Sequence, residues 1–269
     1  MLNGNAASQI PINDRGLMLG DGFFTTIQIR EGHLQLWPEH WSRIEECCQR
    51  LRLPLPHEEG LLTRLHGMAS DQSRACIKLV LTRGSGGRGY SPLGCDQPNE
   101  MIGVFPFPLH YLTWRQQGVA LGICKQRLGS SPMLAGLKTL NRLEQVLLKA
   151  ELDESGLDEA VVLNTAGQVI EAVTANLFWR RDCVLYTPDL SLMGVRGVMR
   201  AWVLKQVARL GYDHAVVQAP LSSLLQADEV FMTNALMEVV PVTGIDDVEY
   251  PDHAFARQLQ SLLAAPSHS

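Results

Sequence analysis

Several kinds of segment are missing from this sequence, and each absence narrows the class of protein. No run of about eighteen apolar residues occurs, which excludes an ordinary membrane-spanning helix. The N-terminus has no basic flank followed by an apolar core, so we expect no secretory signal. No long basic block is present, and the formal net charge is −5, which argues against nucleic acid as the main partner.

Cysteine pairs at the spacing of metal ligands are missing as well. None of the six cysteines belongs to a C-x-x-C pair, and no histidine cluster accompanies them at metal-ligand spacing. We therefore expect no metal, free thiols and a location in the reducing cytoplasm. A cysteine nucleophile is unsupported, because no cysteine has a recognisable histidine-paired context. The six are Cys47, Cys48, Cys76, Cys95, Cys124 and Cys183.

The composition that is present is that of a globular protein. The chain has 269 residues, of which 46% are hydrophobic and 19% charged, and this length suffices for one large domain or two smaller ones. Strand-like and helix-like segments alternate with short hairpin connections, which predicts an α+β fold with mostly antiparallel sheets. Residues 110–118 resemble a connection, so we predict one domain over residues 1–115 and a second over residues 116–269.

Local patterns predict individual elements. Glu31-Gly32 separates two β-rich runs, which is typical of a hairpin, and Pro38 opens a helix. A second helix follows Lys138, with apolar residues at every third or fourth position. These apolar positions are Leu140, Leu143, Val146, Leu147 and Ala150.

Lys138 lies at the entrance of that helix, between leucines, where a lysine is unexpected. An ammonium group in apolar surroundings is destabilised, so the amine becomes a nucleophile that can form an imine with a carbonyl. A lysine that extends its amine to water, or that caps a loop, fits the same position. The residue alone leaves both interpretations open.

Three further positions suit a cofactor with a ring and a phosphate. Glu171 follows two apolar residues at a strand end, and a buried carboxylate there needs a cation such as a protonated pyridine nitrogen. Residues 194–202 bring two glycines to a helix entrance, where backbone N–H groups can face a phosphate. Arg43 is a candidate for the same anion. Each position has an ordinary alternative, namely a solvated strand end, a plain helix entrance and a surface arginine.

Six motifs, taken in order, resemble a known family. They are D-R-G-L-M-L-G-D-G-F-F (14–24), H-W-S-R (40–43), Lys138 before a helix, E-x-x-x-x-N-L-F (171–178), Y-T-P (186–188) and G-V-x-G-V-M-R (194–200). Over nearly its whole length the chain is similar to the class IV aminotransferases, the fold-type-IV pyridoxal phosphate enzymes. That family includes branched-chain and D-amino acid transaminases and 4-amino-4-deoxychorismate lyase. One position departs from the family pattern, because Val173 stands where a small residue is usual, next to the expected place of the cofactor ring.

The resemblance implies a fold, a cofactor and a set of roles. The implied fold is α+β and like that of D-amino acid aminotransferase, with a small N-terminal α/β domain and a larger C-terminal domain that has a barrel-like sheet. Pyridoxal 5'-phosphate would lie between the two domains, usually in a homodimer. Lys138 would be the Schiff-base lysine and proton shuttle, and Glu171 would pair with the pyridine nitrogen. The implied phosphate contacts are Arg43, the backbone of Val198 and Met199, and the turn at Asn234 and Ala235.

Two stretches are similar to the lyase members rather than to the transaminases. They are F-T-T at residues 24–26 and R-G-S-G-G-R-G-Y at residues 83–90. The implied activity converts the small molecule 4-amino-4-deoxychorismate to 4-aminobenzoate and pyruvate, toward folate. Thr26 would position the lysine or the leaving oxygen. Arg83 or Arg88 would anchor the two substrate carboxylates, and Tyr90 would close the pocket.

Other interpretations stay open at this point. The 83–90 stretch also fits a glycine-rich surface turn or an RGG-like RNA contact, although it is no Walker loop because no G-K-[ST] follows. A transaminase of D- or branched-chain amino acids would share every cofactor residue. A catalytically silent ligand-binding relative would have no chemical need for both Lys138 and Glu171.

Overall fold

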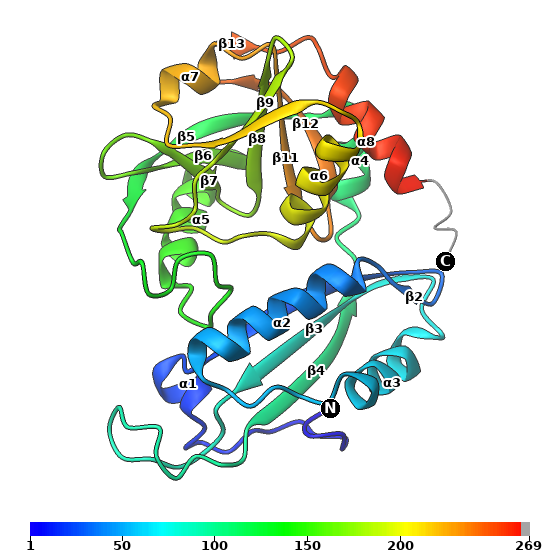
Figure 1. Cartoon of the computed structure of the whole chain (residues 1–269), viewed down its shortest axis with the longest axis vertical. Coiled ribbons are helices and arrows are strands. Elements are labelled where there is room, and N and C mark those ends of the chain that lie inside the picture. Colours follow the sequence, from blue (N-terminus) through cyan, green and yellow to red (C-terminus); the bar gives the residue numbers. More distant parts are fainter. Residues whose placement is uncertain (265–269) are drawn as a thin grey trace. The chain divides into compact units, whose positions relative to one another are not determined.

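The computed structural model describes residues 1–264, and this part of the chain divides into two compact units (Figure 1). The first division falls after Pro108, earlier than the boundary expected from the sequence. A short segment from the middle of the chain also belongs to the first unit, because it hydrogen-bonds to the edge of that unit's sheet. Unit 1 consists of Met1–Pro108 and Leu137–Arg142, and unit 2 consists of Leu109–Gly136 and the chain from Leu143 onward.

Unit 1 is built on a four-stranded antiparallel sheet in the order β2-β1-β3-β4. The predicted hairpin is confirmed: Arg30 pairs with His33 across Glu31-Gly32, and both turn residues have the positive φ that a two-residue type I′ turn requires. Pro38 stands in the first turn of α2, where its missing N–H costs no hydrogen bond. The strands are β1 (Gly22–Arg30), β2 (His33–Leu34), β3 (Arg74–Thr82) and β4 (Asn99–Pro106), and the helices are α1 (Arg15–Leu19), α2 (Trp37–Leu51) and α3 (Glu58–Ala69).

The hydrophobic core of unit 1 lies between one face of this sheet and helices α2 and α3 (Figure 1). Alternation along β1 sends Phe23 and Ile27 to that face, where they pack with Ile44 of α2. All three side chains are fully buried. The intervening residues Phe24 and Thr26 therefore point to the opposite face of the sheet.

Unit 2 is built on a nine-stranded sheet that curls into a partial barrel (Figure 1). The strand path is β10-β9-β8-β11-β12-β5-β6-β7, and β13 pairs with β12. Most pairs are antiparallel, as predicted, but β5 is parallel to both of its neighbours and β10 is parallel to β9. The strands are β5 (Val119–Leu128), β6 (Glu159–Asn164), β7 (Val169–Ala172), β8 (Asn176–Arg181), β9 (Val184–Pro188), β10 (Asp213–Val217), β11 (Glu229–Asn234), β12 (Glu238–Ile245) and β13 (Val248–Glu249).

One helix of unit 2 was not expected. Helix α4 (His110–Gln117) occupies the segment that resembled a connection. Arg115 holds it by donating to the carbonyl oxygens of Leu236 and Met237. The same side chain pairs with Glu238, and no local pattern indicates contacts so distant in sequence. The other helices are α5 (Leu143–Ser155), α6 (Val198–Arg209), α7 (Leu221–Leu225) and α8 (Ala254–Ala264).

Helix α5 carries much of its apolar stripe on the outside. Leu143, Val146 and Leu147, three of the apolar positions expected along this helix, are 70%, 60% and 49% exposed. The helix is instead fixed to unit 2 by Leu148 and Leu152, which are buried in a cluster with residues of β5 and β6. A helix was predicted here, but it begins at Leu143, so Lys138 and Leu140 lie before it in the segment that joins unit 1. The pattern also did not indicate which face of the helix is covered.

All six cysteines are free thiols, and Cys183 alone among them is exposed. Within residues 1–264, no helix is long and apolar enough to cross a membrane. In the same range, no three histidine, cysteine, aspartate or glutamate side chains gather as a metal site would require.

Candidate functional site

Lys138 lies on a short segment that extends the sheet of unit 1 beside β1. The N–H of Phe24 donates to the carbonyl oxygen of Lys138 at 3.0 Å, and Phe23 is paired with Thr139. Successive residues of such a segment face opposite sides of the sheet. Leu137 and Thr139 therefore face the core, each 1% exposed, and Lys138 faces away from it. Leu137, which precedes the lysine in sequence, therefore does not contribute to the surroundings of its amine.

The amine of Lys138 shares a sheet face with a small group of functional side chains. Its Nζ lies 4.7 Å from the ring centroid of Phe24, and the Nζ of Lys78 lies 4.9 Å from the same centroid. Lys78 is the cross-strand partner of Thr26, so both side chains project from this face. One face of unit 1 therefore carries the amine of Lys138, a hydroxyl group, an aromatic ring and a second cation.

Arg43 approaches β1 from helix α2. Its Nη1 donates to Oγ1 of Thr25 at 3.4 Å, and that oxygen is also 2.7 Å from Nδ1 of His40. Burial lowers the pKa of Arg43 to about 10, so the guanidinium is still a cation at neutral pH. Burial, and then the charge of Arg43, hold the pKa of His40 well below its ordinary value. Unit 1 therefore contains a buried positive charge beside a neutral histidine, which suits a phosphate ligand.

Glu171 belongs to strand β7 and is 5% exposed. Its Oε2 accepts the N–H of Val195 at 2.9 Å. Gly194 has a φ of +77°, and a Cβ at this position would lie 3.2 Å from that carboxylate oxygen, so the glycine lets the loop pass close by. Val173, the departure from the family pattern, packs in the core with Leu190. The carboxylate is thus held by a backbone donor in an orientation fixed by the loop.

Helix α6 begins at the glycine-rich stretch, as predicted. Its cap residue Gly197 has no side chain, and no acceptor within the described residues takes the N–H groups of Val198 and Met199. Both residues are buried. Arg200 adds a cation in the same turn, and burial lowers its pKa to about 10, with the charge of Arg196 acting in the same direction. Free N–H groups and a buried cation at a helix N-terminus fit a phosphate.

Asn234 and Ala235 lie where β11 turns into β12. The Oδ1 of Asn234 accepts the N–H groups of Leu236 and Met237, at 2.9 and 2.8 Å. Its Nδ2 donates to the carbonyl oxygen of Thr174 at 3.1 Å. Because the amide shapes the turn in this way, a cofactor contact at this position would come from the backbone.

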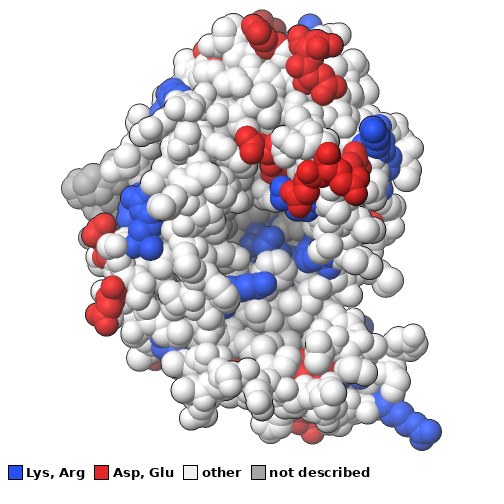
Figure 2. Space-filling view, turned by 180° about the vertical axis from the view of Figure 1, so that it is seen from behind, with Lys and Arg blue, Asp and Glu red and all other residues white. Residues whose placement is uncertain are grey.

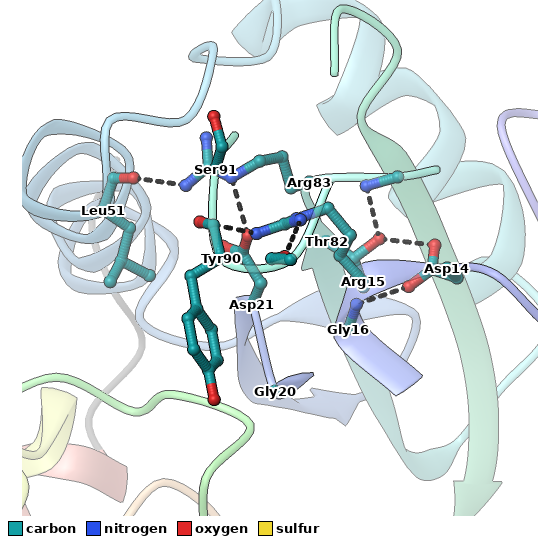
Figure 3. A network of polar contacts seen from close by, with 12 residues as sticks. Asp14, Arg15, Gly16, Gly20, Asp21, Leu51, Thr82, Arg83, Tyr90 and Ser91 are labelled. Atoms are coloured by element: carbon teal, nitrogen blue, oxygen red, sulfur yellow. Dashed lines mark hydrogen bonds and ion pairs between the residues drawn. The ribbon is translucent and has the colours of Figure 1, made fainter. Parts of the chain in front are cut away.

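Arg83 lies in a polar network inside unit 1 (Figure 3). Its Nε donates to the carboxylate of Asp21 at 2.8 Å, and Arg15 donates to the same carboxylate at 2.9 Å. Its other two nitrogens donate to the carbonyl oxygens of Leu51 and Arg52, at 2.7 and 2.9 Å, where α2 ends. Burial would raise the pKa of Asp21, but the hydrogen bonds from both arginines outweigh burial and the pKa is lowered. All three nitrogens of Arg83 therefore bind within unit 1.

Arg88 and Tyr90 lie farther along the same glycine-rich loop, and both side chains are exposed. Arg15 donates to the carbonyl oxygens of Gly89 and Tyr90, as Figure 3 shows for the latter. The loop backbone is thereby tied to the polar network, while these two side chains are presented to the outside.

The sequence-based prediction assigned no role to two residues that the structure places beside the candidate site residues. Lys78 is the only charged residue inside an otherwise apolar part of β3, and strand alternation would have placed it opposite Thr26. Asn176 uses both ends of its amide on the loop before α6, at Val195 and Gly197. Asn176 stands in the E-x-x-x-x-N-L-F motif, but the sequence did not indicate its contacts, because the loop is distant in sequence and irregular in structure.

One face of the molecule shows how charged side chains are distributed over its surface (Figure 2). On the face drawn in Figure 2, lysine and arginine side chains form small separate groups among wide uncharged areas. A protein that binds a phosphate backbone typically has a continuous basic patch or stripe on its surface. This face does not have that character.

The fold is that of the fold-type-IV pyridoxal phosphate enzymes. The model of the family "Amino-transferase class IV" matches residues 22–245, which is most of the chain. This chain belongs to the class IV aminotransferase family, whose members depend on pyridoxal phosphate.

Relatives of this chain include both lyases and transaminases. The aminodeoxychorismate lyase of Vibrio harveyi is 43% identical over 266 residues, which cover 97% of this chain and 98% of that protein. The crystal structure of 4-amino-4-deoxychorismate lyase from Pseudomonas aeruginosa has a TM-score of 0.92 and 38% identity, over 98% of this chain and 97% of that one. The putative branched-chain-amino-acid aminotransferase of Methanocaldococcus jannaschii is 32% identical, over 89% of this chain and 83% of its own length.

Proposed function

We propose that this protein is a pyridoxal phosphate-dependent lyase that converts 4-amino-4-deoxychorismate to 4-aminobenzoate and pyruvate, a step toward folate. The observation that carries the proposal is the sheet face of unit 1 on which Lys138 and Lys78 approach the ring of Phe24 beside Thr26. An amine, a hydroxyl group and a second cation suit a substrate with an acidic ring proton, a leaving oxygen and carboxylates. The similarity to two lyases over nearly the whole chain supports the same activity.

We propose that residues of both units hold the cofactor. Glu171 would pair with the ring nitrogen, and the buried N-terminus of α6 would bind the phosphate. When bound, pyridoxal phosphate supplies an aldehyde that condenses with amines and a ring that takes up electrons. The phosphate contacts proposed are Arg43, the N–H groups of Val198 and Met199, and the turn at Asn234 and Ala235.

Lys138 moves the proton in this scheme. Its Nζ takes the proton from the ring carbon that bears the substrate's amino group. The electron pair left behind breaks the carbon–oxygen bond to the enolpyruvyl group, and the ring becomes aromatic. The proton taken by Lys138 ends on the departing pyruvate, so no other reactant is needed. Thr26, on the same sheet face, is placed to orient the lysine or the leaving oxygen.

Lys78 is the residue that we propose as the anchor of one substrate carboxylate. It lines a groove of about 330 Å³ on unit 1, whose apolar walls include Val80, Met101 and Phe105. A mainly apolar groove lined by the side-chain ammonium group of Lys78 suits a carboxylated ring. Lys78 is therefore added to the substrate-binding residues expected from the sequence.

The glycine-rich loop supplies the other proposed substrate contacts. Arg88 is exposed and is the proposed anchor of the second carboxylate, with Tyr90 closing the pocket. Arg83 is less suited to this role, because its three nitrogens bind Asp21 and the end of α2. Of the two arginines expected from the sequence, we therefore favour Arg88.

A coupled assay tests the proposed reaction. A second enzyme generates 4-amino-4-deoxychorismate, and 4-aminobenzoate and pyruvate are both measured. Equal amounts of the two products are expected, and Lys138→Ala should lower the rate by about a thousandfold or more. Rapid transamination of D-alanine or branched-chain amino acids without 4-aminobenzoate would overturn the proposal in favour of a transaminase.

Two further features of the protein are part of the proposal. The exposed apolar residues Leu143, Val146 and Leu147 of α5 form a stripe that suits a subunit interface, which supports a homodimer. The six free cysteines support a reducing location such as the cytoplasm.

A further inference from the structure

Asn176, the first residue of β8, uses both polar atoms of its side chain to hydrogen-bond a single loop. The amide is 6% exposed. Its Nδ2 donates to the carbonyl oxygen of Val195 at 2.8 Å, and its Oδ1 accepts the N–H of Gly197 at 3.0 Å. The two hydrogen bonds hold the loop on both sides of Arg196, so the peptide units between them cannot turn independently.

The loop held in this way, residues 194–197, meets several of the proposed cofactor-binding elements. The N–H of Val195 is bound by the carboxylate of Glu171 at 2.9 Å. Gly197 is the cap of α6, whose free N–H groups suit the phosphate. Gly136, two residues before Lys138 in sequence, exchanges hydrogen bonds with Gly194 and Arg196 at 2.9 and 3.0 Å.

The contact between Asn176 and Gly197 leaves no room for another side chain. A Cβ on Gly197 would lie 2.2 Å from the Oδ1 of Asn176. Aspartate could still accept from the Gly197 N–H but could not donate to Val195, and alanine could do neither. An amide of this length at position 176 is thus the group that fixes both ends of the loop.

We propose that Asn176 is a positioning residue that sets the spacing between the carboxylate of Glu171 and the N–H groups of α6. Through that spacing it determines how well the ring nitrogen and the phosphate of the cofactor are bound at the same time. The proposal rests on the proposed cofactor site, and it assigns to Asn176 no direct contact with the cofactor.

The test is a titration of the cofactor-free protein with pyridoxal phosphate and, separately, with pyridoxal, which has no phosphate. Binding is followed by visible absorbance. Asn176→Ala should weaken the binding of pyridoxal phosphate by about 10- to 100-fold, since two hydrogen bonds are lost. Asn176→Asp should weaken it further, because a carboxylate is added near the phosphate.

For pyridoxal the order of the two variants should reverse. Asn176→Asp keeps the bond to Gly197 and meets no phosphate, so it should bind pyridoxal better than Asn176→Ala does. Loss of stability alone cannot produce a reversal that depends on the ligand's phosphate. The same order for both ligands, or parental affinity in Asn176→Ala, would overturn the proposal.

Asn164→Ala is the matched control. Asn164 is also 6% exposed, and its amide shapes the β6–β7 turn through bonds to Ala166 and Gln168. This variant should lower the unfolding temperature but leave the affinity for pyridoxal phosphate unchanged; an equal loss of affinity would mean that Asn176 has only a general structural role. If the parent protein itself fails to bind pyridoxal phosphate, the proposed cofactor site is wrong, which is a separate outcome.

Discussion

A substitution of Arg83 can distinguish a structural role of this residue from a role in substrate binding. Its three nitrogens bind the Asp21 carboxylate and the carbonyl oxygens of Leu51 and Arg52. The variant Arg83→Lys keeps the positive charge but has one nitrogen in place of three, so it can retain only part of this set. We expect the variant to be less stable while substrate binding is little changed.

The magnitude follows from the hydrogen bonds that are lost. The carbonyl oxygens of Leu51 and Arg52 lie at the C-terminus of α2, where a positive charge also interacts favourably with the helix dipole. A hydrogen bond from a charged donor contributes about 1.5–3 kcal/mol in a buried setting and less where it is exposed. Because the contact to Arg52 is exposed, we expect Arg83→Lys to lower the free energy of unfolding by about 2–4 kcal/mol.

Urea unfolding and steady-state kinetics measure the two effects separately. The midpoint of unfolding should fall in Arg83→Lys, and KM measured at a temperature where the variant is fully folded should stay within about twofold of the parent. Arg88→Lys is the matched comparison, because Arg88 is on the same loop and exposed. It should leave stability unchanged and raise KM. Parental stability together with a raised KM in Arg83→Lys would refute this reasoning.

Three other changes have defined outcomes. Lys78→Met should raise KM for the substrate about 10- to 100-fold by removing a carboxylate anchor, whereas Lys149→Met, on the exposed side of α5, should not. Folded His40 stays neutral because its pKa is lowered well below 6.5, while the unfolded chain takes up a proton there, so stability should fall as the pH drops below 6.5. The unfolding temperature of the His40→Asn variant should therefore depend less on pH in this range than that of the parent protein. Leu148→Ala should cost about 2–5 kcal/mol of stability, whereas Leu147→Ala should mainly raise the dissociation constant of the proposed dimer in analytical ultracentrifugation.

The sequence singled out Lys138 as the proposed reactive lysine, but it did not predict the surroundings of that residue. The motif around Lys138 suggested an imine-forming amine, and the leucines beside it suggested an apolar pocket. The structure pairs this segment with β1, and the alternation of side chains turns Leu137 inward and the lysine outward. That pairing joins residues more than a hundred positions apart, so no local pattern could have indicated it.

Arg83 and Lys78 also show what could and could not be predicted from the sequence. The loop containing Arg83 was recognised, but a sequence does not show that an arginine's nitrogens are already bound by Asp21 and the end of α2. Lys78 could have been found, because a lysine within an apolar strand needs a reason. Helix α4 was missed because it is held by the contacts of Arg115 with β12 and the turn before it.

The Leu137–Arg142 segment limits how a protein of this kind can be altered by recombination. A gene fusion that exchanged everything after residue 108 would bring in a foreign lysine segment together with a foreign unit 2. The strand edge that receives this segment, at Phe24, would still come from the original parent. The two must match in register, since a slip of one residue would turn the lysine toward the core. Recombinant proteins that remain active must therefore combine a lysine segment and a β1 strand edge that match each other in register.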